Sequence, residues 1–151
     1  MHIFVDADAC PVKKEIIETA RPFRVPVVMV ASHAHRISPE PGVTVVQVDR
    51  SNQSADLYIA NHVKPGDVLV TQDFGLASIG LSRRSCVLSY RGQTYSEETI
   101  GFLLERRHFL SRQRRGGMRL KGPKAMTRED RMHFQLCLTK ILTSMQEIGP
   151  P

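Results

Sequence analysis

The sequence lacks several features that mark particular classes of protein. Its 151 residues contain no tryptophan and only three cysteines. No run of about 18 apolar residues occurs, so no transmembrane helix is predicted. Cys10, Cys86 and Cys137 are odd in number and widely spaced, which favours reduced thiols over a disulfide framework. No Cys-x-x-Cys or histidine pair has the spacing of a zinc finger.

The sequence also shows no pattern typical of a targeting segment. The first residues pass directly into an apolar stretch, without a basic region or a long apolar region before it. We therefore expect no secretory signal, a cytoplasmic location and no membrane partner. With 41% hydrophobic residues the chain can bury a core without disulfides. We expect a single domain over 1–151, with a core over about 1–93 and a basic helical C-terminal part over about 94–151.

Acidic residues are absent from one C-terminal segment. Residues 1–100 hold 10 Lys and Arg against 11 Asp and Glu, whereas residues 101–151 hold 11 against 4. The segment 106–124 has no acid and eight basic residues, which are Arg106, Arg107, Arg112, Arg114, Arg115, Arg119, Lys121 and Lys124. Because glycines and a proline interrupt it, we expect a flexible basic loop that binds a nucleic-acid backbone, with RNA as the expected partner. A solvated surface is the alternative.

Apolar segments and amphipathic segments alternate along the first part of the chain. Continuous apolar runs of strand length are typical of parallel strands that are covered on both faces. The predicted strands are 3–5, 25–31, 43–48, 67–72 and 86–90. Predicted helices begin at Pro11, occupy 53–63 and 73–82, and begin again near Glu97 and after Thr127. This order predicts an α/β fold with three layers, in which helices cover both faces of a mostly parallel sheet.

Aspartates stand where these strands end. Asp6 follows the first strand, Asp8 is two residues further on, and Asp73 ends the fourth strand. Asp56 lies in the first turns of the second helix. The carboxyl ends of parallel strands share one edge of the sheet, where ligands bind. Because clustered carboxylates favour a hard cation, we predict a Mg²⁺ or Mn²⁺ site with these four residues as metal-binding and catalytic groups.

Two of these aspartates also have a structural alternative. Asp73 could only cap the helix that follows it, and Asp8 could cap the helix at Pro11. Ser54 and Thr71 are predicted to support the site by hydrogen-bonding a ligand carboxylate or a bound phosphate.

Several motifs together resemble one bacterial family. They are Val5-Asp6-Ala7-Asp8-Ala9-Cys10-Pro11-Val12, Asp56 in Ser-Ala-Asp-Leu-Tyr-Ile, Thr71-Gln72-Asp73-Phe74-Gly75-Leu76-Ala77, Arg91-Gly92 followed by Tyr95, and Gly122-Pro123 with Asp130-Arg131 and Phe134. The sequence resembles the YaiI/YqxD family over nearly its whole length. That family is grouped with PIN-like domains, a class of metal-dependent ribonucleases. The resemblance implies a PIN-like α/β/α fold with Asp6, Asp56 and Asp73 as the site acids.

Three functions fit these observations. The first is a nuclease dependent on Mg²⁺ or Mn²⁺, with RNA as substrate. The second is an RNA-binding or ribosome-associated module without turnover, because some relatives carry an acid where this chain has Gln53. The third is a phosphatase of the haloacid-dehalogenase type, which also begins with a strand followed by Asp-x-Asp, although it lacks support from a later acidic pair after a strand.

Overall fold

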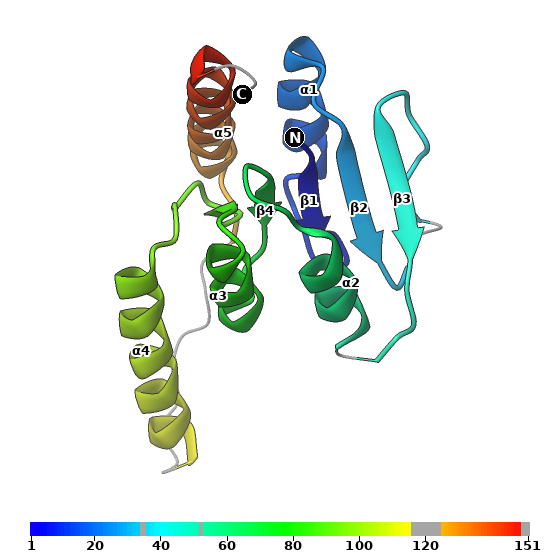
Figure 1. Cartoon of the computed structure of the whole chain (residues 1–151). Coiled ribbons are helices and arrows are strands. Elements are labelled where there is room, and N and C mark those ends of the chain that lie inside the picture. The colour runs from blue at the N-terminus through cyan, green and yellow to red at the C-terminus, as the bar shows by residue number, and fades with distance from the viewer. Residues whose placement is uncertain (34–35, 52, 116–124, 149–151) are drawn as a thin grey trace.

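The computed structural model describes residues 1–33, 36–51, 53–115 and 125–148 (Figure 1). The strands are β1 (Ile3–Asp6), β2 (Val27–Ala31), β3 (Val43–Gln47), β4 (Val68–Val70) and β5 (Cys86–Leu88). The helices are α1 (Lys13–Phe23), α2 (Ser54–His62), α3 (Phe74–Ser82), α4 (Glu97–Arg115) and α5 (Arg128–Ile148). Every predicted strand and helix is therefore present. The helix expected at Pro11 begins two residues later, with Val12 at its N-cap.

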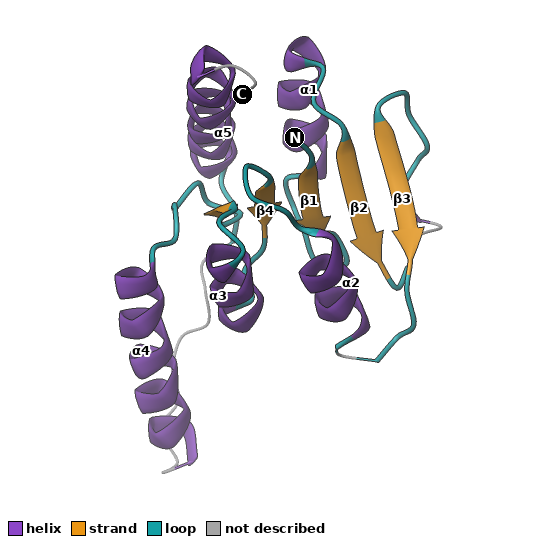
Figure 2. Ribbon diagram, in the orientation of Figure 1, coloured by secondary structure: helices purple, strands orange, loops and turns teal. Residues whose placement is uncertain are grey.

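The strands form one five-stranded sheet in the order β3-β2-β1-β4-β5. All neighbouring pairs are parallel, and the arrowheads of β1, β2 and β3 in Figure 2 point the same way. The chain adds β2 and β3 on one side of β1, and then crosses over through α2 to place β4 on the other side. The order therefore reverses between β1 and β4. In open α/β sheets such a reversal leaves a crevice beyond the carboxyl ends of the two strands.

Alternate residues of the strands face opposite layers of helices. Val5 of β1 lies in one cluster of buried side chains with Ile16 of α1 and Phe134 of α5. Its neighbour Phe4 lies in a second cluster with Ile59 of α2 and with residues of α3. The predicted three-layer α/β/α fold is thus confirmed. None of the helices in the described part of the chain is long and apolar enough to span a membrane.

The C-terminal helix α5 belongs to the core of the sheet. Phe134, Leu138 and Leu142 have no solvent exposure, and Ile141 and Met145 pack partly buried against the same cluster. The helical spacing of Phe134, Leu138, Ile141 and Met145 in the sequence predicts this face, and the structure adds Leu142 to it. Because α5 also packs along α1, it completes the layer that covers one side of the sheet.

The basic segment differs from the prediction in its first half. Residues 106–115 form the end of α4 and are not a loop. Between Phe102 and Arg115 the sequence contains no glycine or proline, and arginine is a good helix former. The helix is also fixed at its start, where Ser96 Oγ accepts a hydrogen bond from Thr99 N and the Ile100 side chain is buried. The expected loop can therefore include at most residues 116–124, which lie outside the described residues.

A candidate metal centre at the carboxyl ends of the strands

A cleft of about 290 Å³ opens at the reversal point of the strand order. All four predicted acids line it, which are Asp6, Asp8, Asp56 and Asp73. Residues from the ends of β2 and β3 complete the walls, namely Ser32, His33, Val48, Asp49, Arg50 and Ser51, with Ala55 of α2. The fold therefore brings together acids that are up to 67 positions apart in the sequence.

Asp6 is the most buried of these four acids. It ends β1, and its Oδ2 accepts a hydrogen bond of 3.0 Å from the Thr71 hydroxyl. The hydroxyl of the buried Tyr90 donates to the Asp6 carbonyl oxygen at 2.7 Å, which fixes the backbone there. Burial raises the pKa of Asp6, and repulsion from Asp73 and Asp8 adds to this effect, while the bond from Thr71 opposes it.

Asp56 reaches the cleft from the first turn of α2. Burial raises its pKa to about 6, and the negative charges of Asp73 and Asp6 contribute in the same direction. A carboxylate so close to others releases its proton reluctantly because its charge meets like charges. The three acids Asp6, Asp56 and Asp73 therefore form one electrostatically coupled group.

Asp73 caps a helix and also contributes negative charge to the cleft. Its Oδ1 accepts a hydrogen bond of 2.9 Å from Leu76 N, so it caps α3 as the structural alternative supposed. Its own N–H donates to the Thr71 hydroxyl at 3.0 Å. Thr71 therefore joins the two acids that end β1 and follow β4, since its hydroxyl also donates to Asp6. The helix cap uses the Oδ1 atom of Asp73.

Asp8 is turned toward the loop after β2. It accepts hydrogen bonds from Ser32 N, Ser32 Oγ and His33 N at 2.9–3.1 Å. The alternative in which Asp8 caps the helix at Pro11 is wrong, because its oxygens meet these donors instead. Although partial burial raises the pKa of Asp8, the bonds from Ser32 and His33 outweigh that effect and lower it. Asp8 is therefore ionised at neutral pH and holds the loop against β1.

Known proteins resemble this chain over nearly its whole length. A UPF0178 protein of Bacillus velezensis is 51% identical over 148 residues, which cover 97% of this chain and 88% of that protein. A UPF0178 protein of Listeria monocytogenes is 44% identical over 141 residues, which cover 93% and 95%. The model of a family described as "Uncharacterized BCR, YaiI/YqxD family" matches residues 4–144. The chain belongs to the YaiI/YqxD family. No solved structure matches it.

The family motifs fall in two places in the fold. Those with Asp6, Asp56 and Asp73 meet at the cleft. Two of the other motifs meet at α5, where Arg91 forms an ion pair of 2.6 Å with Asp130 in the first turn of that helix. Gly92 has a φ of +87°, and a Cβ there would lie 2.8 Å from His133 Nδ1. These contacts give Arg91, Gly92 and Asp130 a structural role, while Gly122 and Pro123 lie outside the described residues.

The chemistry of the donors in this family member fits a hard divalent cation. The described residues include no group of three or more His, Cys, Asp and Glu already arranged as a metal site. The acids are nevertheless oxygen donors, and burial and mutual repulsion raise the pKa of Asp6 and Asp56. A bound Mg²⁺ or Mn²⁺ would relieve that repulsion. Asp6, Asp56 and Asp73 are the residues that would hold it.

Of the other predicted site residues, Ser54, Arg106 and Arg112 do not line the cleft. The Ser54 hydroxyl pairs with that of Ser51, and Ser54 does not line the cleft. Arg106 and Arg112 are exposed on α4. Arg107, Arg114 and Arg115 also belong to α4, while Arg119, Lys121 and Lys124 lie outside the described residues. Gln53 is exposed at the N-cap of α2 and makes no capping bond through its side chain.

Sequence reasoning missed most of the walls of the cleft. The predicted site includes none of five residues that line the cleft, which are Ser32, His33, Asp49, Arg50 and Ser51. Their position in the sequence could have identified them, because all five residues follow the strands β2 and β3 at the edge of the sheet that carries the acids.

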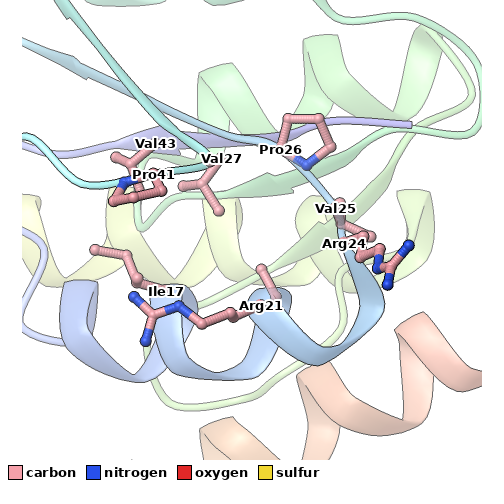
Figure 3. A pocket seen from close by; sticks show the side chains of 10 residues that line it. Ile17, Arg21, Arg24, Val25, Pro26, Val27, Pro41 and Val43 are labelled. Carbon is pink, nitrogen blue, oxygen red and sulfur yellow. The ribbon is translucent and has the colours of Figure 1, made fainter.

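A second cavity, of about 250 Å³, lies at the other end of the sheet (Figure 3). Ile17 and Arg21 of α1 face it from one side, and Val27 and Val43 at the starts of β2 and β3 face it from the other. It shares no residue with the acidic cleft. We therefore treat the acidic cleft alone as the candidate functional site.

Proposed function

We propose that this protein is a cytoplasmic nuclease dependent on Mg²⁺ or Mn²⁺, with RNA as its substrate. The observation that carries the proposal is the convergence of Asp6, Asp56 and Asp73 in one cleft, where burial raises the pKa of Asp6 and Asp56 and the charges of neighbouring carboxylates add to this effect. A protein gains stability from separating like charges, so an arrangement that crowds them indicates a cationic ligand. The resemblance to PIN-like ribonucleases supports the same chemistry.

The residues have different tasks in this proposal. Asp6, Asp56 and Asp73 hold the metal ion, which when bound activates water and stabilises the charge that develops at the phosphate. Thr71 positions Asp6 and Asp73 through its hydroxyl. Asp8 orders the loop after β2, and its lowered pKa makes it a weak proton acceptor.

Basic residues bring the substrate to these acids in the same proposal. Arg106 and Arg112 are exposed on α4, and the helix extends in the direction in which the strands point (Figure 1). Arginine binds phosphate oxygens through two parallel hydrogen bonds. Contacts of this kind read the backbone and carry little sequence information.

The environment of Asp8 weighs against the phosphatase alternative. In a haloacid-dehalogenase site the acid two residues after the nucleophile must donate a proton. Here Asp8 accepts hydrogen bonds from Ser32 and His33, and its pKa is lowered. A carboxylate that is held ionised is a poor general acid at neutral pH. The binding-module alternative makes the same contacts with RNA and differs only in turnover.

Cleavage of a labelled single-stranded RNA, with Mn²⁺ or with EDTA, tests the proposal. The wild type should cleave only with the metal, and Asp6→Asn and Asp73→Asn should abolish cleavage. Asp49→Asn, which changes an exposed acid in the same cleft, is the matched control and should remain active.

Three results would contradict the nuclease proposal. Salt-sensitive RNA binding without metal-stimulated cleavage would favour the RNA-binding module. A phosphoaspartate trapped at Asp6 would favour the phosphatase. Cleavage that is unchanged in Asp6→Asn would show that the acids do not carry the activity.

A further inference from the structure

Arg50 is a cation in the wall of a cleft that five aspartates also line. The aspartates that line the cleft with it are Asp6, Asp8, Asp49, Asp56 and Asp73. Arg50 is exposed, and no salt bridge found among the described residues includes it. A guanidinium group that only neutralised the cleft would be expected to pair with one of these carboxylates. Its position suits an anion that enters from solvent.

The backbone on both sides of Arg50 is anchored. Val48 N donates to Ala31 O at 3.0 Å, which ties the start of the loop to the end of β2. Ser54 N donates to Ser51 O at 3.3 Å, and the hydroxyls of these two serines are paired. The backbone that carries Arg50 therefore lies between two fixed points, so little backbone entropy is lost when the residue binds a ligand.

Arg50 and the basic helix lie on opposite sides of the acids. Arg50 follows β3, which is one edge strand of the sheet, and α4 follows β5, which is the other. Asp6 and Asp73 come from β1 and β4, between these edges. In Figure 1 the connection from β3 to α2 and the helix α4 flank the carboxyl ends of the central strands. Two cationic regions thus border one acidic centre.

We propose that Arg50 binds a backbone phosphate of single-stranded RNA on the β3 side of the acids, so that the strand lies across the carboxyl edge of the sheet from α4 to Arg50. The inference rests on the proposed function, because it names how that site holds its substrate. A phosphate on this side meets no other arginine or lysine among the described residues that line the cleft. Arg50 supplies the positive charge that compensates for the neighbouring carboxylates there.

Salt dependence of RNA binding separates a phosphate contact from a structural role. Affinity would be measured by fluorescence anisotropy on a labelled oligouridylate, with Ca²⁺ in place of Mg²⁺ to slow turnover, over a series of salt concentrations. Arg50→Gln should weaken binding roughly 10-fold and reduce the slope of log K against log salt by about 0.7, the value for one phosphate contact on a single strand.

Two further variants isolate the cause. Arg50→Lys keeps the charge, so the slope and the Mn²⁺ affinity measured by calorimetry should be unchanged, while RNA binding weakens by roughly 3-fold because the two-pronged contact is lost. Arg83→Gln removes an exposed charge at the far end of α3 from Asp73, and it should bind RNA like the wild type.

The outcomes distinguish this inference from the proposed function. If the wild type binds RNA and Arg50→Gln keeps both its affinity and its slope, Arg50 is no phosphate contact and the nuclease proposal stands. If the wild type binds no RNA, both are overturned. If Arg83→Gln reduces the slope as much as Arg50→Gln, the effect is one of net charge and the inference fails.

Discussion

Replacing Asp56 by asparagine should stabilise the metal-free protein at neutral pH. The pKa of Asp56 is raised from 3.8 to about 6 by burial and by the charges of Asp73 and Asp6. Because the folded state holds the proton more tightly than the unfolded state, stability falls as pH rises between these two values. Above pH ~6 the whole cost is present, and below pH ~4 it is absent. After allowance for solvent screening of this partly exposed group, the cost is about 1 kcal/mol.

Urea unfolding followed by circular dichroism measures this cost. In EDTA at pH 7, Asp56→Asn should be more stable than the wild type by about 1 kcal/mol, and the difference should vanish near pH 4. In saturating Mn²⁺ the wild type should be the more stable of the two proteins, because only the wild type gains the full free energy of metal binding. This gain is about 2.7 kcal/mol at a metal concentration of 100 times Kd. Asp49→Asn serves as the control and should change stability by less than about 0.5 kcal/mol.

The reasoning is refuted if Asp56→Asn is no more stable than the wild type at pH 7 without metal. It is also refuted if the difference is the same at pH 4, since the effect would then have no connection with ionisation.

Two other substitutions test the framework of the site and of the fold. Thr71→Val removes the hydroxyl that donates to Asp6 and accepts from Asp73 N. We expect the free energy of unfolding in urea to fall by about 1–3 kcal/mol and the Mn²⁺ affinity to fall roughly 10-fold or more, as for other groups that support metal ligands. The control Thr44→Val, on the exposed side of β3, should change neither quantity. Phe134→Ala deletes a fully buried ring between α5 and the sheet and should cost about 3–5 kcal/mol, whereas Met132→Ala on the exposed side of α5 should cost little, and equal losses would show that α5 does not belong to the core.

The convergence of the acids followed from the sequence because it depends on few physical steps. Continuous apolar runs predict parallel strands, and parallel strands end at one edge. Asp6 and Asp73 each follow such a run, so the sequence places both at one edge of the sheet. Their contact through Thr71 also requires that β1 and β4 are neighbours, which the sequence does not determine. The buried face of α5 could also be predicted from the sequence, because Phe134 and Leu138 repeat at helical spacing.

The partners of these acids depended on contacts that no local pattern contains. Asp8 meets Ser32, 24 residues away, because β2 lies beside β1 in the sheet. The Tyr90 hydroxyl reaches the Asp6 carbonyl across 84 residues. The place of Arg50 depends on β3 being an edge strand, which the order of segments along the chain does not determine.

Helix α4 shows how composition misled the prediction. The number of arginines and the glycines at 116 and 117 suggested a loop for the whole basic segment. Arginine is compatible with a helix, however, and Ile100 anchors α4 beside α3. Charge composition therefore did not determine the local structure of this segment.

The central claim is that Asp6, Asp56 and Asp73 hold a divalent cation. Calorimetric titration of Mn²⁺ into the wild type and into the double variant Asp6→Asn/Asp73→Asn tests it most directly. We expect saturable binding by the wild type and none by the double variant, with both proteins giving the same circular dichroism spectrum. Equal binding by the two proteins, or no binding by the wild type, would contradict the claim.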